Sequence, residues 1–199
     1  LTYTVTVDDR EGEPNSTDTQ DVVITITGTN DQPDVFVDTD AGDSAAETIA
    51  ETNGGLTASG TLSVSDVDTT DVVSVTGVTV VASGSGATDA GLAVPDNATL
   101  DAMFSVSADA TPQAEQEIDG SSNTGTINWS FDSGAEAFDY LAVNESLILT
   151  YTVTVDDREG EPNSTDPPDV VLTIPGTNEQ PDGFVDTDSC YSAAETIPA

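Results

Sequence analysis

The sequence predicts an all-β protein made of antiparallel β-sandwich repeats in tandem. Three observations predict it: short stretches that alternate apolar and polar residues, turn-forming clusters between them, and an internal repeat. Residues 1–51 recur as residues 149–199, an offset of 148, with about 40 of the 51 aligned positions identical. A period near 150 residues is too long for a solenoid coil of roughly 20 to 50 residues, so each unit is predicted to be a whole domain.

The repeat divides the chain into three parts. We expect residues 1–31 to be the closing strands of a preceding repeat, residues 32–180 to be one complete sandwich, and residues 181–199 to start a following repeat. The two copies differ most near the end, where Pro167, Pro168 and Pro175 replace Thr19, Gln20 and Thr27. Because proline removes a ladder donor, the strand that contains Pro175 is predicted to lie at an edge or to fray.

The strands are predicted from period-two alternation and from their content of Val, Ile and Thr. In chain order they cover residues 1–7, 22–28, 56–65, 72–82, 126–131 and 147–155. Clusters such as SGSGATDAG, EIDGSSNTG and REGEPNST separate them and are typical of turns. A helical turn is expected only at residues 135–141. Several short strands at intervals of about ten residues favour an antiparallel sandwich.

Composition excludes several functions. The chain has 38 acidic and 2 basic residues, a formal net charge of -36, and no His. Such a surface repels phosphate backbones and anionic lipids, so we expect no nucleic-acid partner and no membrane insertion. The basic residues are Arg10 and Arg158, so histidine and lysine chemistry is absent, and Cys190 has no partner for a disulfide within the chain. We therefore expect no enzymatic activity, and cations as natural partners.

Most of the carboxylates are expected to form a solvated surface, but two groups of them are closely spaced. Asp66, Asp68 and Asp71 lie in SDVDTTD directly after a predicted strand. Asp157 lies in the motif DDRE, at the end of a second predicted strand that is followed by a turn. Carboxylates held this close repel one another, and a hard cation relieves the repulsion. Ca²⁺ accepts six to eight oxygen ligands in flexible geometry and suits such loops, whereas Mg²⁺ keeps more of its waters.

The segments ASGTLSVSDVDTTD, FDSGAEAFDYLAVNESLILTYTVTVDD and DVVITITGTNDQP resemble the VCBS-type repeats of large bacterial surface adhesins of the RTX and Bap-like kind. The resemblance covers essentially the whole complete unit. It implies immunoglobulin-like or cadherin-like sandwiches in a secreted extracellular fibre at the bacterial cell surface. It further implies neighbouring repeats as partners, support of adhesion or biofilm formation, and a surface ligand bound by other domains of the parent protein.

A more distant similarity to cadherins suggests where the ion binds. The order of acidic motifs along the chain is similar to the order of calcium motifs in cadherins. That similarity implies a Ca²⁺ site at the junction between repeats, which would stiffen an otherwise hinged linker. Its ligands would be Asn30, Asp31, Glu51, Asp66, Asp68 and Asp157.

Two alternatives follow from other parts of the chain. Residues 1–31 contain two strands that would expose an apolar face in isolation, so copies of the chain could assemble into a filament by β-strand exchange. The segment from Ser83 to Gly125 is long for a minimal sandwich and contains several acids. It is predicted either to add strands, with Leu100 and Phe104 among their apolar residues, or to form a loop that binds a carbohydrate or protein ligand.

Overall fold

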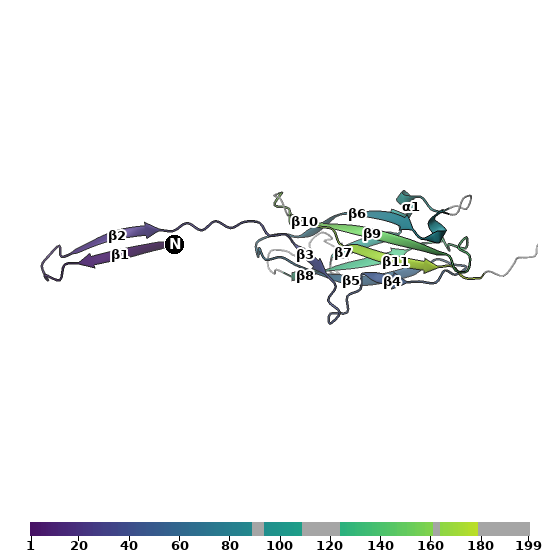
Figure 1. Ribbon diagram of the computed structural model, residues 1–199, viewed down its shortest axis with the longest axis horizontal. Helices are drawn as coiled ribbons and strands as arrows, with labels where there is room; N and C mark the ends of the chain where they lie inside the picture. Colours follow the sequence, from purple (N-terminus) through teal and green to yellow (C-terminus); the bar gives the residue numbers. More distant parts are fainter. Residues whose placement is uncertain (89–93, 109–123, 161–163, 179–199) are drawn as a thin grey trace, which may run out of the picture.

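The computed structural model describes residues 1–88, 94–108, 124–160 and 164–178. It contains an N-terminal β-hairpin, an extended connecting segment and a β-sandwich (Figure 1). In the hairpin, β1 (Thr2–Asp8) pairs antiparallel with β2 (Thr17–Val23) as a two-stranded sheet of its own. The hairpin lies beyond one end of the sandwich and does not pack on it (Figure 1).

The first sheet of the sandwich is built around its longest strand, β9 (Ser146–Asp156). On one side β9 pairs antiparallel with β6 (Ser74–Ser83), and on the other with β10 (Thr165–Asp166) and then β11 (Asp169–Pro175). The short strand β4 (Ala46–Thr48) runs parallel to β11 and completes this sheet. One strand therefore has partners along both of its edges and lies at the centre of the fold.

The second sheet has four strands in the order β3-β5-β8-β7, all antiparallel. Its strands are β3 (Asp34–Phe36), β5 (Thr57–Ser65), β7 (Phe104–Ala108) and β8 (Thr124–Asp132). A 3-10 turn, η1 (Ser85–Thr88), and a short helix, α1 (Asn97–Asp101), lie between β6 and β7. The prediction of an all-β antiparallel sandwich is confirmed, with β4 and β11 as its one parallel pair among the described strands.

The core lies between the two sheets and follows from the alternation of the sequence. Every second residue of β9, from Leu147 to Val155, is 0% exposed, and the residues between them are half-buried. Trp129 and Phe131 of β8 face them from the other sheet. The ring of Phe104 stacks on that of Tyr151 with centroids 4.2 Å apart. Burial of these side chains supplies the main driving force for folding.

Two predictions about individual strands are wrong, one in each copy of the repeat. The strand expected at residues 22–28 ends at Val23, where the chain leaves the hairpin. The strand that contains Pro175 is not an edge strand, because β11 has β9 on one side and β4 on the other. Proline is tolerated there because Pro175 is the last residue of the strand, and its carbonyl still accepts from the Glu51 backbone N–H at 3.1 Å.

The region between β6 and β8 also differs from expectation. The helix lies at α1 and not at residues 135–141, which form turns. Its start is fixed locally, because the Asp96 side chain accepts from the Thr99 backbone N–H as an N-cap. Of the long segment, the structure describes α1, which contains Leu100, and β7, which begins at Phe104 and is an added strand. The following repeat expected at residues 181–199 lies outside the described residues.

Candidate metal centre

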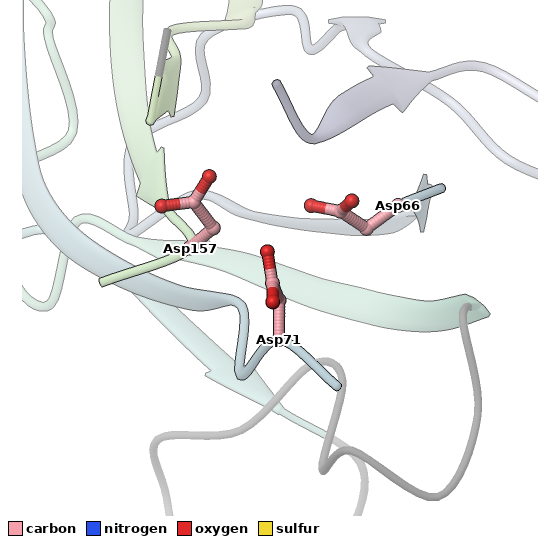
Figure 2. A group of neighbouring side chains, drawn as sticks. All are labelled: Asp66, Asp71 and Asp157. Carbon is pink, nitrogen blue, oxygen red and sulfur yellow. The ribbon is translucent and has the colours of Figure 1, made fainter. Parts of the chain in front are cut away.

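Three carboxylates converge at the end of the sandwich nearest the hairpin. Asp66, Asp71 and Asp157 each place a carboxylate oxygen within 4.8 Å of the others, and Figure 2 shows the three groups turned toward a shared space. Their side chains are 3%, 6% and 1% exposed. At this separation and an effective dielectric constant near 20, each charged pair repels by about 3 kcal/mol. The cluster is therefore costly unless protons or a cation neutralise it.

Strand ends place these three residues together. Asp66 directly follows β5 and Asp157 directly follows β9, so both leave the sandwich at the same end. A tight turn after Asp66 brings the chain back, since the Asp71 backbone N–H donates to the Asp68 carbonyl at 3.0 Å. The backbone N–H of Asp157 donates to the Ser164 carbonyl at 3.0 Å, which fixes the start of the next loop.

Two carboxylate oxygens of the cluster have no hydrogen-bond partner. Asp66 accepts the Asp68 backbone N–H at 2.9 Å through Oδ1, and Asp157 accepts the Glu159 backbone N–H at 3.0 Å through Oδ1. The Oδ2 atoms of Asp66 and Asp71 are buried and have no hydrogen-bond partner. A buried carboxylate oxygen without a donor carries a desolvation cost of a few kcal/mol. A bound cation would give both oxygens a partner.

Burial raises the pKa of two members of the cluster. For Asp66 the largest cause is desolvation, and the charges of Asp68 and Asp157 raise its pKa further. For Asp71 desolvation is again the largest cause, followed by the charges of Asp66, Asp68 and neighbouring acids. Both effects oppose the charged form of these two carboxyl groups. A divalent cation would reverse this balance.

The segment that joins the hairpin to the sandwich is bound to the same cluster. The Asn30 side-chain Nδ2 donates to Asp157 Oδ2 at 2.8 Å, and the Asp31 backbone N–H donates to Asp68 Oδ2 at 2.8 Å. Asp68 in turn is tied to Asp66 through the turn described above. Five of the six residues that the sequence singled out, Asn30, Asp31, Asp66, Asp68 and Asp157, are therefore neighbours in the structure.

Glu51 is not part of this group. Its backbone N–H donates to the Pro175 carbonyl, and Pro175 pairs with Ser146 at the start of β9, whereas Asp157 follows the end of β9. An 11-residue strand spans ~35 Å at about 3.3 Å per residue, so Glu51 lies at the opposite end of the sandwich. The prediction that grouped Glu51 with the other five is wrong, because parallel pairing of β4 with β11 carries it to the far end.

Glu51 has partners of its own at that end. It is 1% exposed, and its Oε1 accepts from the backbone N–H and the hydroxyl of Thr177 at 2.6 and 2.8 Å. Its Oε2 is buried with no hydrogen-bond partner. Thr177 directly follows Gly176 after β11, so this carboxylate binds the chain as it leaves the sandwich.

Asp71 is the member of the cluster that the expected ligand set lacked. It belongs to the motif SDVDTTD, whose spacing was the signal that acids gather there. Spacing alone does not say which acids of a turn face inward. The structure turns Asp66 and Asp71 inward, while Asp68 is half-buried and receives the linker.

The donor set fits a hard cation. The carboxylates of the cluster offer only oxygen atoms as metal ligands, and hard cations such as Ca²⁺ and Mg²⁺ prefer oxygen ligands. Asp66, Asp71 and Asp157 would supply the charge. Asp68 and the side-chain amide of Asn30 could supply further ligands, because hydrogen bonds hold both against the cluster. Several carboxylates on loops favour Ca²⁺, which takes more protein ligands than Mg²⁺ does.

Comparisons with known proteins find distant similarity in structure only. No protein-family model matches the chain, and no curated protein matches it significantly. A PapD-like (ASH) domain of human CEP192 is similar with a TM-score of 0.41 and 13% identity over 80% of this chain and 95% of that one. The CooA pilin subunit of enterotoxigenic Escherichia coli is similar with a TM-score of 0.41 and 12% identity, over 75% and 99%. Similarity this distant carries no argument about function.

Among the residues that the structure describes, no helix is long and apolar enough to span a membrane.

Proposed function

We propose that this chain is a structural repeat of an extracellular fibre, without enzymatic activity, in which Ca²⁺ stiffens the junction between repeats. In this role the sandwich is a spacer, and the cation at its hairpin end fixes the linker to it. The resemblance to repeats of bacterial surface adhesins gives the setting, namely a secreted cell-surface protein that supports adhesion or biofilm formation.

A single observation carries the proposal: the linker binds one acid of the carboxylate cluster and a second acid beside it. Asn30 and Asp31 are consecutive linker residues, and their hydrogen bonds go to Asp157 and Asp68. An ion bound by Asp66, Asp71 and Asp157 would remove the repulsion that pushes these loops apart. The same ion would thereby hold the linker in place, so loss of the ion would loosen the sandwich and its connection together.

The net charge of the chain gives the cation a second role, because a cation at the junction reduces the repulsion between neighbouring domains. A chain of domains with net charge -36 repels itself, and the repulsion acts within a Debye length of about 8 Å at physiological salt. Extracellular calcium modules have dissociation constants of about 10⁻⁴ to 10⁻³ M. The fibre would therefore be rigid outside the cell and loose in a calcium-poor cytosol.

Calcium titration of the purified chain tests the proposal. Calcium at ten to a hundred times the dissociation constant adds roughly 1.4 to 2.7 kcal/mol of stability, which raises the melting temperature by about 3 to 10 °C for a chain of this length. The double variant Asp66→Asn with Asp71→Asn should abolish the rise, whereas Asp139→Asn, which removes one exposed charge far from the cluster, should keep it. Magnesium and chelator complete the series.

An unchanged melting temperature at 10 mM calcium would contradict the cation site. So would a rise of equal size in wild type and double variant, because general screening by divalent ions would then explain it. Extension of the particle in small-angle scattering on addition of calcium is the second readout, since a fixed linker keeps the hairpin at a greater mean distance from the sandwich.

A further inference from the structure

The hairpin β1–β2 leaves a large apolar face without a partner. Seven apolar side chains on one face of the hairpin and of the residues beside it are 45% to 76% exposed, namely Leu1, Tyr3, Val5, Val7, Val22, Ile24 and Ile26. The hairpin lies clear of the sandwich, so no other part of the described chain covers them (Figure 1). A contiguous apolar face of this kind marks an interaction surface.

The sandwich contains the same hairpin in its buried form. Adding the offset of 148 turns Leu1, Tyr3, Val5, Val7, Val22, Ile24 and Ile26 into residues of β9 and β11 that are all 0% exposed: Leu149, Tyr151, Val153, Val155, Val170, Leu172 and Ile174. The strand register is also the same. Thr2 pairs with Val23 as Thr150 pairs with Val171, and Asp8 pairs with Thr17 as Asp156 pairs with Thr165.

The geometry points to the partner of the hairpin, and we infer that β1–β2 is the closing strand pair of a second sandwich of the same repeat. The missing strands are those that cover β9 and β11 here: β6 and β4 at the sheet edges, and β5 and β8 on the facing sheet. We assign them to a copy of residues 33–148 that precedes the hairpin in one polypeptide. This inference deepens the proposed function and rests on its tandem arrangement, but not on the cation.

The same correspondence predicts that the linker residues 28–31 are all held by one or the other of the two sandwiches. Gly28 and Thr29 correspond to Gly176 and Thr177, and Thr177 is held by the buried Glu51 carboxylate. In the assembled pair, Thr29 would bind the Glu51 of the upstream copy. The next residues, Asn30 and Asp31, bind Asp157 and Asp68 of the downstream sandwich. Consecutive residues would thus belong to different sandwiches, which fixes their spacing.

Gly28 gives a specific test of the predicted contact between the linker and the upstream sandwich. At Gly176 an added methyl group would overlap the carbonyl oxygens of Leu141 and Ala142, whereas at Gly28 it would meet nothing within 4 Å. Gly28→Ala should therefore have no effect on the present chain. It should destabilise the upstream sandwich once residues 33–148 are placed ahead of Leu1, because Gly28 then meets the upstream copies of these two carbonyls.

The experiment compares the 199-residue chain with the same chain extended at its N-terminus by residues 33–148, which joins Ile148 to Leu1 in the natural order of the repeat. Hydrogen exchange is measured by mass spectrometry in chelator, with sedimentation to establish the oligomeric state. Peptides of residues 19–26 report on the hairpin, because Thr19 and Gln20 distinguish them from the second copy, which has Pro167 and Pro168 there. We expect the amides of residues 19–26 to exchange at least a hundredfold more slowly in the extended chain, as a monomer, than in the 199-residue chain.

Matched variants show whether the apolar face is the cause. In the extended chain, Val5→Asp on the inward face should remove the protection, and Thr6→Asp on the outward face should keep it. Thr6 corresponds to half-buried Thr154, and Val5 to Val153, which is fully buried. Unchanged exchange in the downstream β11, whose peptides differ in sequence from those of the hairpin, is the folding control for every variant.

Two results would overturn the inference. One is fast exchange of residues 19–26 in both chains. The other is protection that appears only in concentration-dependent oligomers of the 199-residue chain with no gain from the extension, which would make strand exchange between copies the use of the hairpin. Because the exchange is measured in chelator, failure of the calcium site leaves this test intact, and failure here leaves the calcium titration to be judged alone.

Discussion

The hairpin β1–β2 and the strand pair β9–β11 have nearly the same sequence, the same register and different surroundings. Even their loops agree: Arg10 and Arg158 have φ angles of 62° and 67°, and Gly12 and Gly160 both have φ of 70°. In both copies, the second aspartate of the pair accepts the backbone N–H two residues later, at 3.0 Å. The local sequence therefore determines the hairpin, and the rest of the sandwich determines whether its side chains are buried.

This comparison separates local from tertiary contributions to stability. Full burial of one Val, Leu or Ile side chain contributes about 1.5 to 3 kcal/mol. Six such side chains have this contribution in β9–β11 and lack it in β1–β2, and Tyr151 is buried in addition. An isolated two-stranded hairpin is at best marginally stable in water. Identical substitutions in the two copies should therefore have very different effects.

The largest difference is expected for the tyrosine pair. Tyr151 is 0% exposed, stacks on Phe104 and donates its hydroxyl to the Leu100 carbonyl at 2.8 Å, whereas Tyr3 is 54% exposed. Tyr151→Ala should lower the free energy of unfolding of the sandwich by about 3 to 5 kcal/mol. Tyr3→Ala should change it by less than about 0.5 kcal/mol. Urea denaturation followed by the fluorescence of Trp129, the single Trp, measures both.

The milder variant Tyr151→Phe keeps the ring and removes only the hydroxyl, at an expected cost of about 1 kcal/mol. It keeps the comparison measurable if the alanine variant does not fold. Equal effects at positions 3 and 151 would mean that the hairpin is buried in solution, and the contrast between the two copies would then be lost.

A smaller effect is expected from the carboxylate cluster, and it depends on pH. The folded-state pKa values of Asp66 and Asp71 are raised above the ordinary 3.8, mainly by burial and then by neighbouring carboxylates. The folded state thus binds protons more tightly than the unfolded state. The stability due to protonation is complete below pH 3.8 and is lost as pH rises through the raised values. In chelator, the melting temperature should therefore fall as pH is raised from about 4 to 7.

Variants isolate the cluster from the general charge of the chain. At pH 7 in chelator, Asp66→Asn should stabilise the sandwich by roughly 1 to 3 kcal/mol, about the repulsion of one carboxylate pair at an effective dielectric constant near 20. Asp9→Asn is the matched control. It removes the same charge at an exposed position, since Asp9 is the hairpin counterpart of Asp157. Parallel pH profiles for wild type, Asp66→Asn and Asp9→Asn would contradict a special role for the cluster.

The sequence predicted what depends on local pattern. Alternation located β9, and its repetition located β1, because a strand with one buried face requires a period of two. The exposed apolar face of residues 1–31 was also predictable, since the copy showed which side chains a complete sandwich buries. Of the candidate site, Asp66 and Asp157 were predictable because each directly follows a strand.

What the sequence could not give depends on long-range pairing and on turn geometry. The position of Glu51 follows from the parallel pairing of β4 with β11, between residues more than a hundred positions apart. The inward orientation of Asp71 depends on the turn after Asp68. Helix α1 has only five residues, which is too short for a helical period to appear, and its capping residue was the only local signal.

The smallest effect is expected where the two copies differ in sequence. Pro175 replaces Thr27 of the first copy, but it is the last residue of β11 and its carbonyl keeps its bond to Glu51. Pro175→Thr should therefore change the free energy of unfolding by less than about 0.5 kcal/mol, because the lost chain rigidity and the regained N–H offset each other. Denaturation in urea measures this, with Thr173→Pro as the contrasting variant.

Thr173 lies inside β11 between β9 and β4, so proline there should cost about 3 kcal/mol or more. Similar effects at the two positions would mean that β11 ends before Pro175 in solution, and the Thr177–Glu51 contact that follows it would lose its support.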